Sequence, residues 1–304
     1  MDVRQLSALL AVADHGTFSA AADALHTVQS NVSAHVARLE KELGTPLIDR
    51  GQGRLTEEGE AVARRARRIL SEFDAVKADV AALRNEVVGE VRLGLIGTTA
   101  RWLVPQILSI MSERYPQARL RVVEGTTSQL EPQLSTGALD LAIILLPTTV
   151  PDIATQPLFE EDLLLVLHQD HPLASREQIE MEELAEIPLL LPPVGTAARA
   201  ELDNAAAAAG ATLRAMAEID GVHLTASLVF DGMGPSILPA TSLPAYIKEQ
   251  WRLVHVAGLP LRRVGLAHQR RSYPSAPARA MREVLSEVVA AGAELHPGLH
   301  PPTA

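Results

Sequence analysis

Small polar and basic side chains of the kind that hydrogen bond to DNA gather between residues 29 and 54. On a predicted helix over residues 29–43 these are Ser30, Asn31, Ser33 and Arg38, with Gln29 at its start and Arg50 and Arg54 beyond its end. Hydroxyl, amide and guanidinium groups pair with base edges and phosphates. We therefore predict that the first four reach base edges or phosphates in the major groove. Gln29 is predicted to contact the DNA backbone, and Arg50 and Arg54 the adjacent backbone or minor groove.

The spacing of apolar residues supports a helix that exposes this polar face. Val32, Val36, Leu39 and Leu43 recur at intervals of four, three and four, which is typical of one buried helical stripe. A helix is predicted over residues 3–15, and Ser19 is predicted to cap a short helix over residues 20–25. A tight hairpin is predicted over residues 47–55. Residues 1–58 thus predict an all-α DNA-binding domain of the winged helix-turn-helix type.

A long helix with one narrow apolar seam is predicted next, over residues 59–88. The seam, spaced alternately by four and three, consists of Val62, Ala66, Ile69, Phe73, Val76, Val80, Leu83 and Val87. Such a pattern is typical of a coiled coil, so we predict that a second copy of the chain covers it and forms a dimer. The alternative is that the helix packs on the C-terminal part of its own chain. Four arginines between residues 64 and 68 lie beside the seam, and we expect them to pair with glutamates at 57, 60 and 72 rather than with phosphates.

Strands and helices alternate over residues 89–304, which predicts an α/β domain with a largely parallel sheet. The alternation occurs in two blocks, predicting two lobes joined by crossing strands. Lobe I is predicted over about 89–162 and 266–295, and lobe II over about 163–265. Residues 160–167 are predicted to form one strand, and the last residues, 296–304, a loose tail.

A second set of polar residues falls where predicted strands lead into helices. These are Thr98, Thr99, Thr126, Thr127, Ser128, Gly195 and Thr196. Free backbone N–H groups and the helix dipole favour an anion at such positions, although each hydroxyl taken alone is better explained as a helix cap. His223 and Met233 stand beside the second lobe's turns, where they either line a cleft or pack in the core.

Composition excludes several classes of protein. The 304 residues contain no cysteine, so no disulfide, thiolate nucleophile or thiolate metal site is possible. We expect a cytoplasmic protein that does not enter the membrane, because no apolar run or leader sequence is present. No cofactor, metal site or enzyme activity is predicted: Gly94 and Gly97 lack dinucleotide-binding spacing, and His168 and His171 have no further ligands nearby in the sequence. The net charge of −10 lies mostly beyond residue 88, which leaves DNA binding to a few placed arginines.

Several motifs resemble those of the LysR-type transcriptional regulators. They are Phe18-Ser-Ala-Ala-Ala, Leu25-His26, Gln29-Ser-Asn-Val-Ser33, Arg38-Leu39-Glu40, Leu43-Gly44-Thr-Pro-Leu47, Asp49-Arg50 and Leu55-Thr56-Glu-Glu-Gly59. The chain departs from the family at Val28 and Ser30, where serine and proline are frequent, and at Ala34 and Ala37, where arginine is common. No DNA contact is carried over to those two alanines.

The resemblance implies a DNA-binding transcriptional regulator whose linker helices pair and whose C-terminal domain resembles periplasmic binding proteins. It also implies an interrupted palindromic site in double-stranded DNA, a dimer or tetramer, and contact with RNA polymerase. It favours the cleft over the capping interpretation, so we predict that a small anionic effector binds between the lobes. The alternatives are an enzyme or small-molecule carrier fused to a DNA-binding domain, and an architectural DNA protein with a vestigial pocket.

Overall fold

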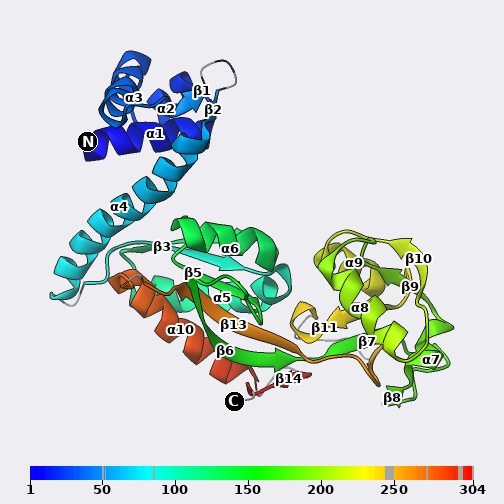
Figure 1. The fold of residues 1–304 in the computed structure, drawn as a ribbon. Coiled ribbons are helices and arrows are strands. Elements are labelled where there is room, and N and C mark those ends of the chain that lie inside the picture. The colour runs from blue at the N-terminus through cyan, green and yellow to red at the C-terminus, as the bar shows by residue number, and fades with distance from the viewer. Residues whose placement is uncertain are drawn as a thin grey trace.

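The computed structural model describes residues 1–49, 51, 53–84, 86–243, 250–271, 273–293 and 297–302, and Figure 1 shows their arrangement. The N-terminal unit contains α1 (Val3–His15), α2 (Phe18–Ala24), α3 (Gln29–Leu43) and the antiparallel hairpin of β1 (Ile48–Asp49) and β2 (Arg54–Leu55). The predicted helix-turn-helix with its wing is confirmed. None of the described helices combines the length and the apolar character needed to cross a bilayer.

Two local details of this unit differ from prediction. Thr17, rather than Ser19, caps α2, because its side chain accepts a hydrogen bond from the backbone N–H of Ala20 at 3.1 Å. The buried stripe of α3 consists of Val32, Val36 and Leu39, whereas Leu43 in the last turn is 42% exposed. The core of the unit therefore ends one helical turn earlier than the spacing predicts.

The long helix α4 (Glu57–Ala82) leaves the N-terminal unit and runs to the first lobe (Figure 1). Thr56 caps it, but the helix ends before Val87 because the N–H groups of Arg84 and Glu86 both donate to the carbonyl of Ala81 and close the last turn. The exposed apolar seam is also shorter than predicted. Val62 and Ala66 pack into the core of the N-terminal unit, so they lie outside any stripe left for a second copy.

The arginines of α4 do not pair mainly with the glutamates predicted for them. Arg64 approaches Glu60 at 3.9 Å, whereas Arg67 pairs with Asp14 of α1 and Arg68 donates to the carbonyl of Ser135 in the first lobe. Asp79 near the end of α4 binds Arg279 of the first lobe at 3.1 Å. The helix thus contacts both the N-terminal unit and its own C-terminal domain.

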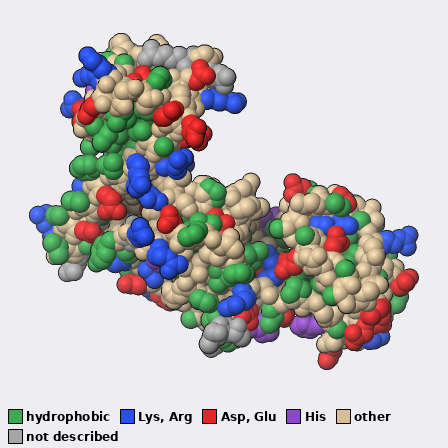
Figure 2. Space-filling model, viewed as in Figure 1, with side chains coloured by type: hydrophobic (Ala, Val, Ile, Leu, Met, Phe, Trp, Pro, Cys, Tyr) green, Lys and Arg blue, Asp and Glu red, His purple; other side chains and the backbone are tan. Residues whose placement is uncertain are grey.

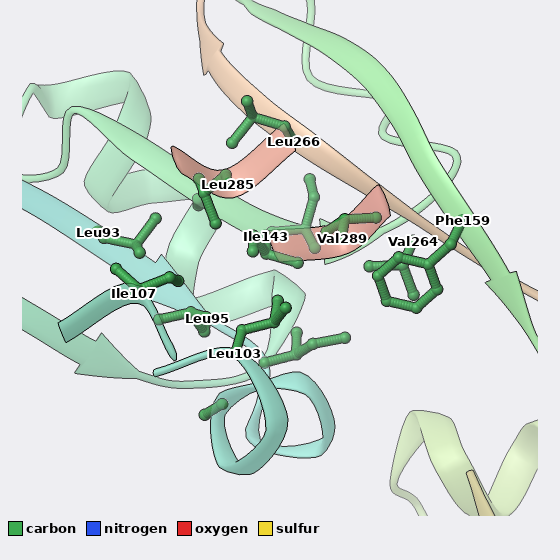
Figure 3. Close-up of a cluster of buried hydrophobic side chains, with 14 of the residues drawn as sticks. Leu93, Leu95, Leu103, Ile107, Ile143, Phe159, Val264, Leu266, Leu285 and Val289 are labelled. Carbon is green, nitrogen blue, oxygen red and sulfur yellow. The ribbon is translucent and has the colours of Figure 1, made fainter. Parts of the chain in front are cut away.

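A six-stranded sheet forms the first lobe, in the order β14-β6-β13-β5-β3-β4. Its strands are β3 (Gly89–Leu95), β4 (Ala118–Glu124), β5 (Leu141–Leu145), β6 (Ile153–Glu161), β13 (Arg262–Gln269) and β14 (Leu299–His300). Its helices are α5 (Gly97–Arg114), α6 (Thr127–Thr136) and α10 (Ala276–Ala293). Figure 3 shows the core in which β3, α5 and α10 meet, with Leu93, Leu95, Leu103, Ile107, Leu285 and Val289.

The second lobe contains a four-stranded sheet in the order β11-β7-β12-β8 and the parallel pair β10-β9. The strands are β7 (Leu163–His168), β8 (Gln178–Ile179), β9 (Pro188–Leu191), β10 (Arg214–Glu218), β11 (Ser236–Pro239) and β12 (Trp251–Val256). The helices are α7 (Met181–Ala185), α8 (Ala197–Ala208), α9 (Val222–Phe230) and a 3₁₀ turn, Ala240–Ser242. Figure 1 shows the two lobes side by side, joined by the crossing strands.

The prediction of a largely parallel sheet is wrong for the strands that cross between the lobes. β3 pairs in parallel with β4 and β5, but β13 is antiparallel to both β5 and β6. The single strand predicted over residues 160–167 is divided at Asp162 into β6 and β7, one in each lobe. β13 joins the first sheet from Arg262 onward, and β14 from the predicted tail pairs with β6. The first lobe therefore includes segments beyond its predicted boundaries.

Candidate DNA interface and effector cleft

Helix α3 presents the predicted DNA-binding side chains on its surface. Gln29, Ser30, Asn31 and Arg38 are exposed, and Ser33 is half-buried. The Asn31 side-chain amide donates to Thr27 Oγ1 at 3.0 Å, and Arg38 Nε donates to the Ala34 carbonyl at 3.2 Å. Both side chains are therefore held along the helix by weak local bonds that a nucleic acid can replace.

The turn before α3 uses an uncommon backbone conformation. His26 has a φ of 51°, in the left-handed region that residues other than glycine rarely adopt. The N–H of the next residue, Thr27, donates to the carbonyl of Ala22 at 2.9 Å and closes the turn. A turn this short sets the angle between α2 and α3, and hence the direction in which the polar face of α3 points.

The wing is fixed to α3 and α4 by two residues that the sequence-based predictions missed. Glu40 Oε1 accepts hydrogen bonds from the backbone N–H groups of Leu47 and Ile48 at 2.9 and 3.3 Å. Gly59 lets α4 approach the wing so closely that an added Cβ would lie 1.9 Å from the Leu47 carbonyl oxygen. A glycine in the first turn of a long helix was the signal available in the sequence. Arg54 is exposed on β2 of the wing, in the strand pair next to the turn, and Arg50 lies outside the described residues.

The lobes approach each other at the start of α5. Gly97 is its first residue, and a Cβ built there would lie 2.8 Å from Glu124 Oε1 and 3.7 Å from His223 Nε2. Glu124 ends β4 of the first lobe and His223 lies in the first turn of α9 of the second, and their side chains are 3.9 Å apart. Figure 2 shows the surface hollowed between the two lobes. Sequence-based reasoning identified His223 but missed Gly97 as a contact point and Glu124 altogether.

Thr98 and Thr99 follow Gly97 in the first turn of α5 rather than in a turn before it. Thr99 is fully buried, and its hydroxyl donates to the Ile96 carbonyl at 3.0 Å, so it has a structural role. The Thr98 hydroxyl is also buried but has no hydrogen bond partner among the described residues. A buried hydroxyl without a partner costs free energy, so Thr98 is the better candidate for binding a ligand.

The remaining predicted cleft residues are engaged in local bonds. Thr126 caps α6 and contacts the Ser128 hydroxyl at 3.0 Å, and Thr127 Oγ1 accepts from the Leu145 N–H at 3.1 Å. Thr196 caps α8, and the preceding Gly195 has a φ of 90° that favours glycine. The helix-cap interpretation therefore describes Thr126 and Thr196. No hydrogen bond or ion pair of the described residues joins Gly195 or Thr196 to Thr98.

Met233 and the outer half of α4 expose large apolar side chains. Met233 is 56% exposed, so it does not pack in a core. On α4 the exposed side chains are Ile69, Phe73, Val76 and Val80, followed by Leu83 at the helix end. Their exposed fractions run from 37% to 86%, and Figure 2 shows hydrophobic side chains exposed along this helix. A stripe of this kind on an isolated chain marks an interaction surface.

A helix-turn-helix unit, a long linker helix and a two-lobed α/β domain together define a class of DNA-binding transcriptional regulators. Residues 3–60 match the model of the bacterial regulatory helix-turn-helix proteins of the lysR family, and residues 84–290 match that of the LysR substrate binding domain. The chain belongs to the LysR family of transcriptional regulators and is not an enzyme.

Relatives of known name match nearly the whole chain. A probable hydrogen peroxide-inducible genes activator of Mycobacterium leprae is 35% identical, with 93% of each chain covered. The DNA-binding transcriptional dual regulator OxyR of Escherichia coli K12 is 30% identical, with 97% of each covered. Among solved structures, a full-length OxyR of Pseudomonas aeruginosa in which aspartate replaces a cysteine has a TM-score of 0.78. It is 26% identical, and the alignment covers 100% of this chain and 99% of that one.

Proposed function

We propose that this protein is a cytoplasmic, effector-responsive regulator that binds double-stranded DNA as a dimer or higher oligomer. The polar face of α3 reads the major groove, the wing contacts the adjacent backbone or minor groove, and the exposed stripe of α4 pairs with a second copy. A small anionic effector binds between the lobes, and the regulator contacts RNA polymerase. The effector acts by binding one arrangement of the assembly better than another.

The unpartnered Thr98 hydroxyl at the start of α5 is the observation that carries the effector part of this proposal. The first N–H groups of a helix have no partners within the helix, and the helix dipole favours negative charge beside them. A ligand carboxylate or phosphate placed there would accept hydrogen bonds from Thr98 Oγ1 and from the backbone. The buried hydroxyl would then gain the partner that it lacks in the free protein.

Glu124 refines the prediction of an anionic effector. Its side chain lies beside Gly97, so a carboxylate of the protein already occupies the favourable end of α5. His223 approaches that carboxylate from the other lobe at 3.9 Å. An anionic effector would take the place of Glu124 at the helix terminus and leave His223 free to pair with the ligand. Effector binding would therefore change a contact between the lobes.

Thiol-based detection of hydrogen peroxide is excluded for this chain. Its relatives in Mycobacterium leprae and Streptomyces viridosporus are named probable hydrogen peroxide-inducible genes activators. Protein thiolates are the groups that peroxide oxidises reversibly to sulfenic acid or disulfide, and this sequence has no cysteine. We infer that the chain retains the architecture of those relatives but responds to a non-covalently bound effector.

A substitution that removes only the hydroxyl tests the effector site. A panel of small carboxylates and phosphates is screened with the full-length protein by thermal shift. Thr98→Val should then weaken the affinity for each ligand found by about tenfold, the value of one hydrogen bond to a charged group. The matched control is Thr136→Val, because the Thr136 hydroxyl bonds to Gln133 within α6. Equal affinities in the wild type and Thr98→Val would place the effector elsewhere.

Peroxide treatment tests the exclusion of thiol chemistry. The protein is exposed briefly to hydrogen peroxide, and the peroxide is then removed. The footprints of the treated protein on DNA that was isolated with it should be the same as those of the untreated protein. A reductant-reversible change in the footprint would contradict the inference, because it would require thiol oxidation, which a chain without cysteine cannot undergo.

A further inference from the structure

We propose that the cavity between α4 and the first lobe is a second ligand site, which binds a small phosphate-class anion. The cavity has a volume of about 390 Å³ and lies away from the cleft between the lobes. Arginines from two parts of the chain line it: Arg65 and Arg68 from α4, and Arg271 and Arg282 from the first lobe. Figure 2 shows Lys and Arg side chains gathered along α4 and beside it.

The charge of this cavity is not balanced within the described residues. None of its four arginines makes an ion pair with a described acidic residue. Three acidic residues also line it, Glu72, Asp140 and Asp152. Asp140 is already neutralised, because Arg92 binds it through the guanidinium at 2.7 and 3.1 Å and through its backbone N–H at 2.8 Å. The remaining positive charge favours an anion.

Arg68 supplies a donor that is buried and unused. Its Nη2 group donates to the Ser135 carbonyl, but its buried Nε has no hydrogen bond partner among the described residues. The arginine is fixed by close packing, since its Cγ would lie 3.3 Å from a Cβ added at Gly137. A buried guanidinium N–H without an acceptor is unfavourable, and a phosphate oxygen is an acceptor of suitable charge.

The size and chemistry of the cavity define the ligand. Cavities of about 300 Å³ and above accept small molecules, and arginine pairs bind phosphate oxygens with two hydrogen bonds each. Tyr273 and Ser275 line the same cavity and offer hydroxyl groups. Inorganic phosphate or a small phosphate monoester therefore fits this site.

The position of the site gives the ligand a means to affect the DNA-binding unit. Its arginines come from the helix that carries the N-terminal unit and from the lobe that carries half of the cleft. An anion held by both would stabilise their present arrangement and would have lower affinity for any arrangement that separates them. This second ligand would thus set the orientation of α4 independently of the effector.

Phosphate titrations of the full-length protein at constant ionic strength test the proposal. Phosphate should raise the melting temperature above the value in an equal ionic strength of chloride. Arg65→Gln and Arg271→Gln should each raise the half-saturating phosphate concentration about tenfold. Arg64→Gln is the matched control, since Arg64 is an exposed neighbour on α4 that does not line the cavity, and it should leave the concentration unchanged.

Two further measurements distinguish this site from other anion sites. Arg38→Ala should retain the phosphate effect, and hydrogen exchange with phosphate should be slowed in residues 65–75 of α4. The proposal would be overturned if phosphate did not raise the melting temperature of the wild type, or if neither cavity substitution changed the half-saturating concentration. It would also be overturned if Arg38→Ala abolished the effect, because the anion would then lie on the DNA-binding face.

Discussion

Gly59→Ala is predicted to loosen the DNA-binding unit because it forces α4 away from the wing. The new methyl group would lie 1.9 Å from the Leu47 carbonyl oxygen, a backbone atom that cannot rotate away. Restoring an ordinary separation of about 3.4 Å requires the helix to retreat by about 1.5 Å. That shift would break the hydrogen bond of 3.0 Å from the Thr56 N–H to the same carbonyl and the bond of 2.8 Å from the Thr56 hydroxyl to Pro46.

The expected cost follows from opposing contributions. Two lost hydrogen bonds cost about 2 kcal/mol, and overpacking costs a further 1–3 kcal/mol, roughly. Alanine in place of glycine within a helix returns about 1 kcal/mol. The net destabilisation of about 3 kcal/mol is a large fraction of the roughly 5–15 kcal/mol that stabilises a typical domain.

Tryptophan placement allows the affected unit to be distinguished from the rest. Trp102 and Trp251 are the only tryptophans and both lie in the C-terminal lobes, so fluorescence-detected urea unfolding should be nearly unchanged in Gly59→Ala. Hydrogen exchange in residues 3–55 should accelerate and DNA affinity should fall. The matched control is Gly125→Ala, whose Cβ would meet only side-chain atoms, at 3.3 Å or more. Wild-type exchange and DNA affinity in Gly59→Ala would refute the close approach of helix and wing.

Three other substitutions test separate parts of the molecule. Arg38→Ala should abolish specific footprints while the fluorescence-detected unfolding stays unchanged; persistence of those footprints would refute its role in DNA reading. Phe73→Glu should weaken dimerisation by at least about 3 kcal/mol in analytical ultracentrifugation, because it removes an apolar contact and buries a charge. Arg262→Met should cost about 3–5 kcal/mol, because it leaves the fully buried Glu161 without its guanidinium partner at 3.3 Å. Arg262 also pairs with Glu201, whose pKa is raised by burial. Without the arginine, the charge of ionised Glu201 has no partner, so the loss of stability in Arg262→Met should grow as pH rises above about 4.5.

Matched substitutions separate these effects from general damage. Arg214→Ala removes an exposed arginine on β10 and should leave DNA binding intact. Val3→Glu adds the same charge as Phe73→Glu at an exposed apolar position of α1, and dimerisation should not change. The direction of this pH effect follows from the raised folded-state pKa of Glu201. The contribution of Glu201 to the free energy of unfolding is fully present below its unfolded-state pKa and is lost as the carboxyl ionises in the folded protein. A stability loss in Arg262→Met that shrinks with rising pH would contradict this.

Periodicity predicted the N-terminal unit well because local spacing determines it. The buried stripe of α3 and the wing follow from residues close together in the sequence, and both are present in the structure. The contact between Gly59 and Leu47 could not be predicted in this way, since it depends on how two helices and a hairpin meet in space. The end of α4 was placed too late because valine spacing continues beyond Leu83, although the backbone has already turned.

The candidate effector cleft was harder to predict because its residues come from different lobes. Strand-end threonines were identified by their position, yet Thr126 and Thr196 mainly cap their own helices. Glu124 was missed because a glutamate at the end of a strand is ordinary in isolation. Only the fold brings it beside Gly97 and His223. The crossing strands were also divided incorrectly, since an uninterrupted apolar run does not reveal where a chain passes from one lobe to another.

The contacts between α4 and the first lobe are weak enough for the proposed effector to alter them. The polar bonds across this interface include Arg92 to Ser71 at 3.2 Å, Arg279 to Asp79 at 3.1 Å, and the bond from Arg68 to Ser135. Exposed or half-buried bonds of this kind are worth about 1 kcal/mol each or less. Coupling between ligand sites is typically about 1–3 kcal/mol, which is comparable to their sum. The proposed effector could therefore supply enough free energy to break these bonds, but not enough to disrupt the apolar core of the first lobe, shown in Figure 3.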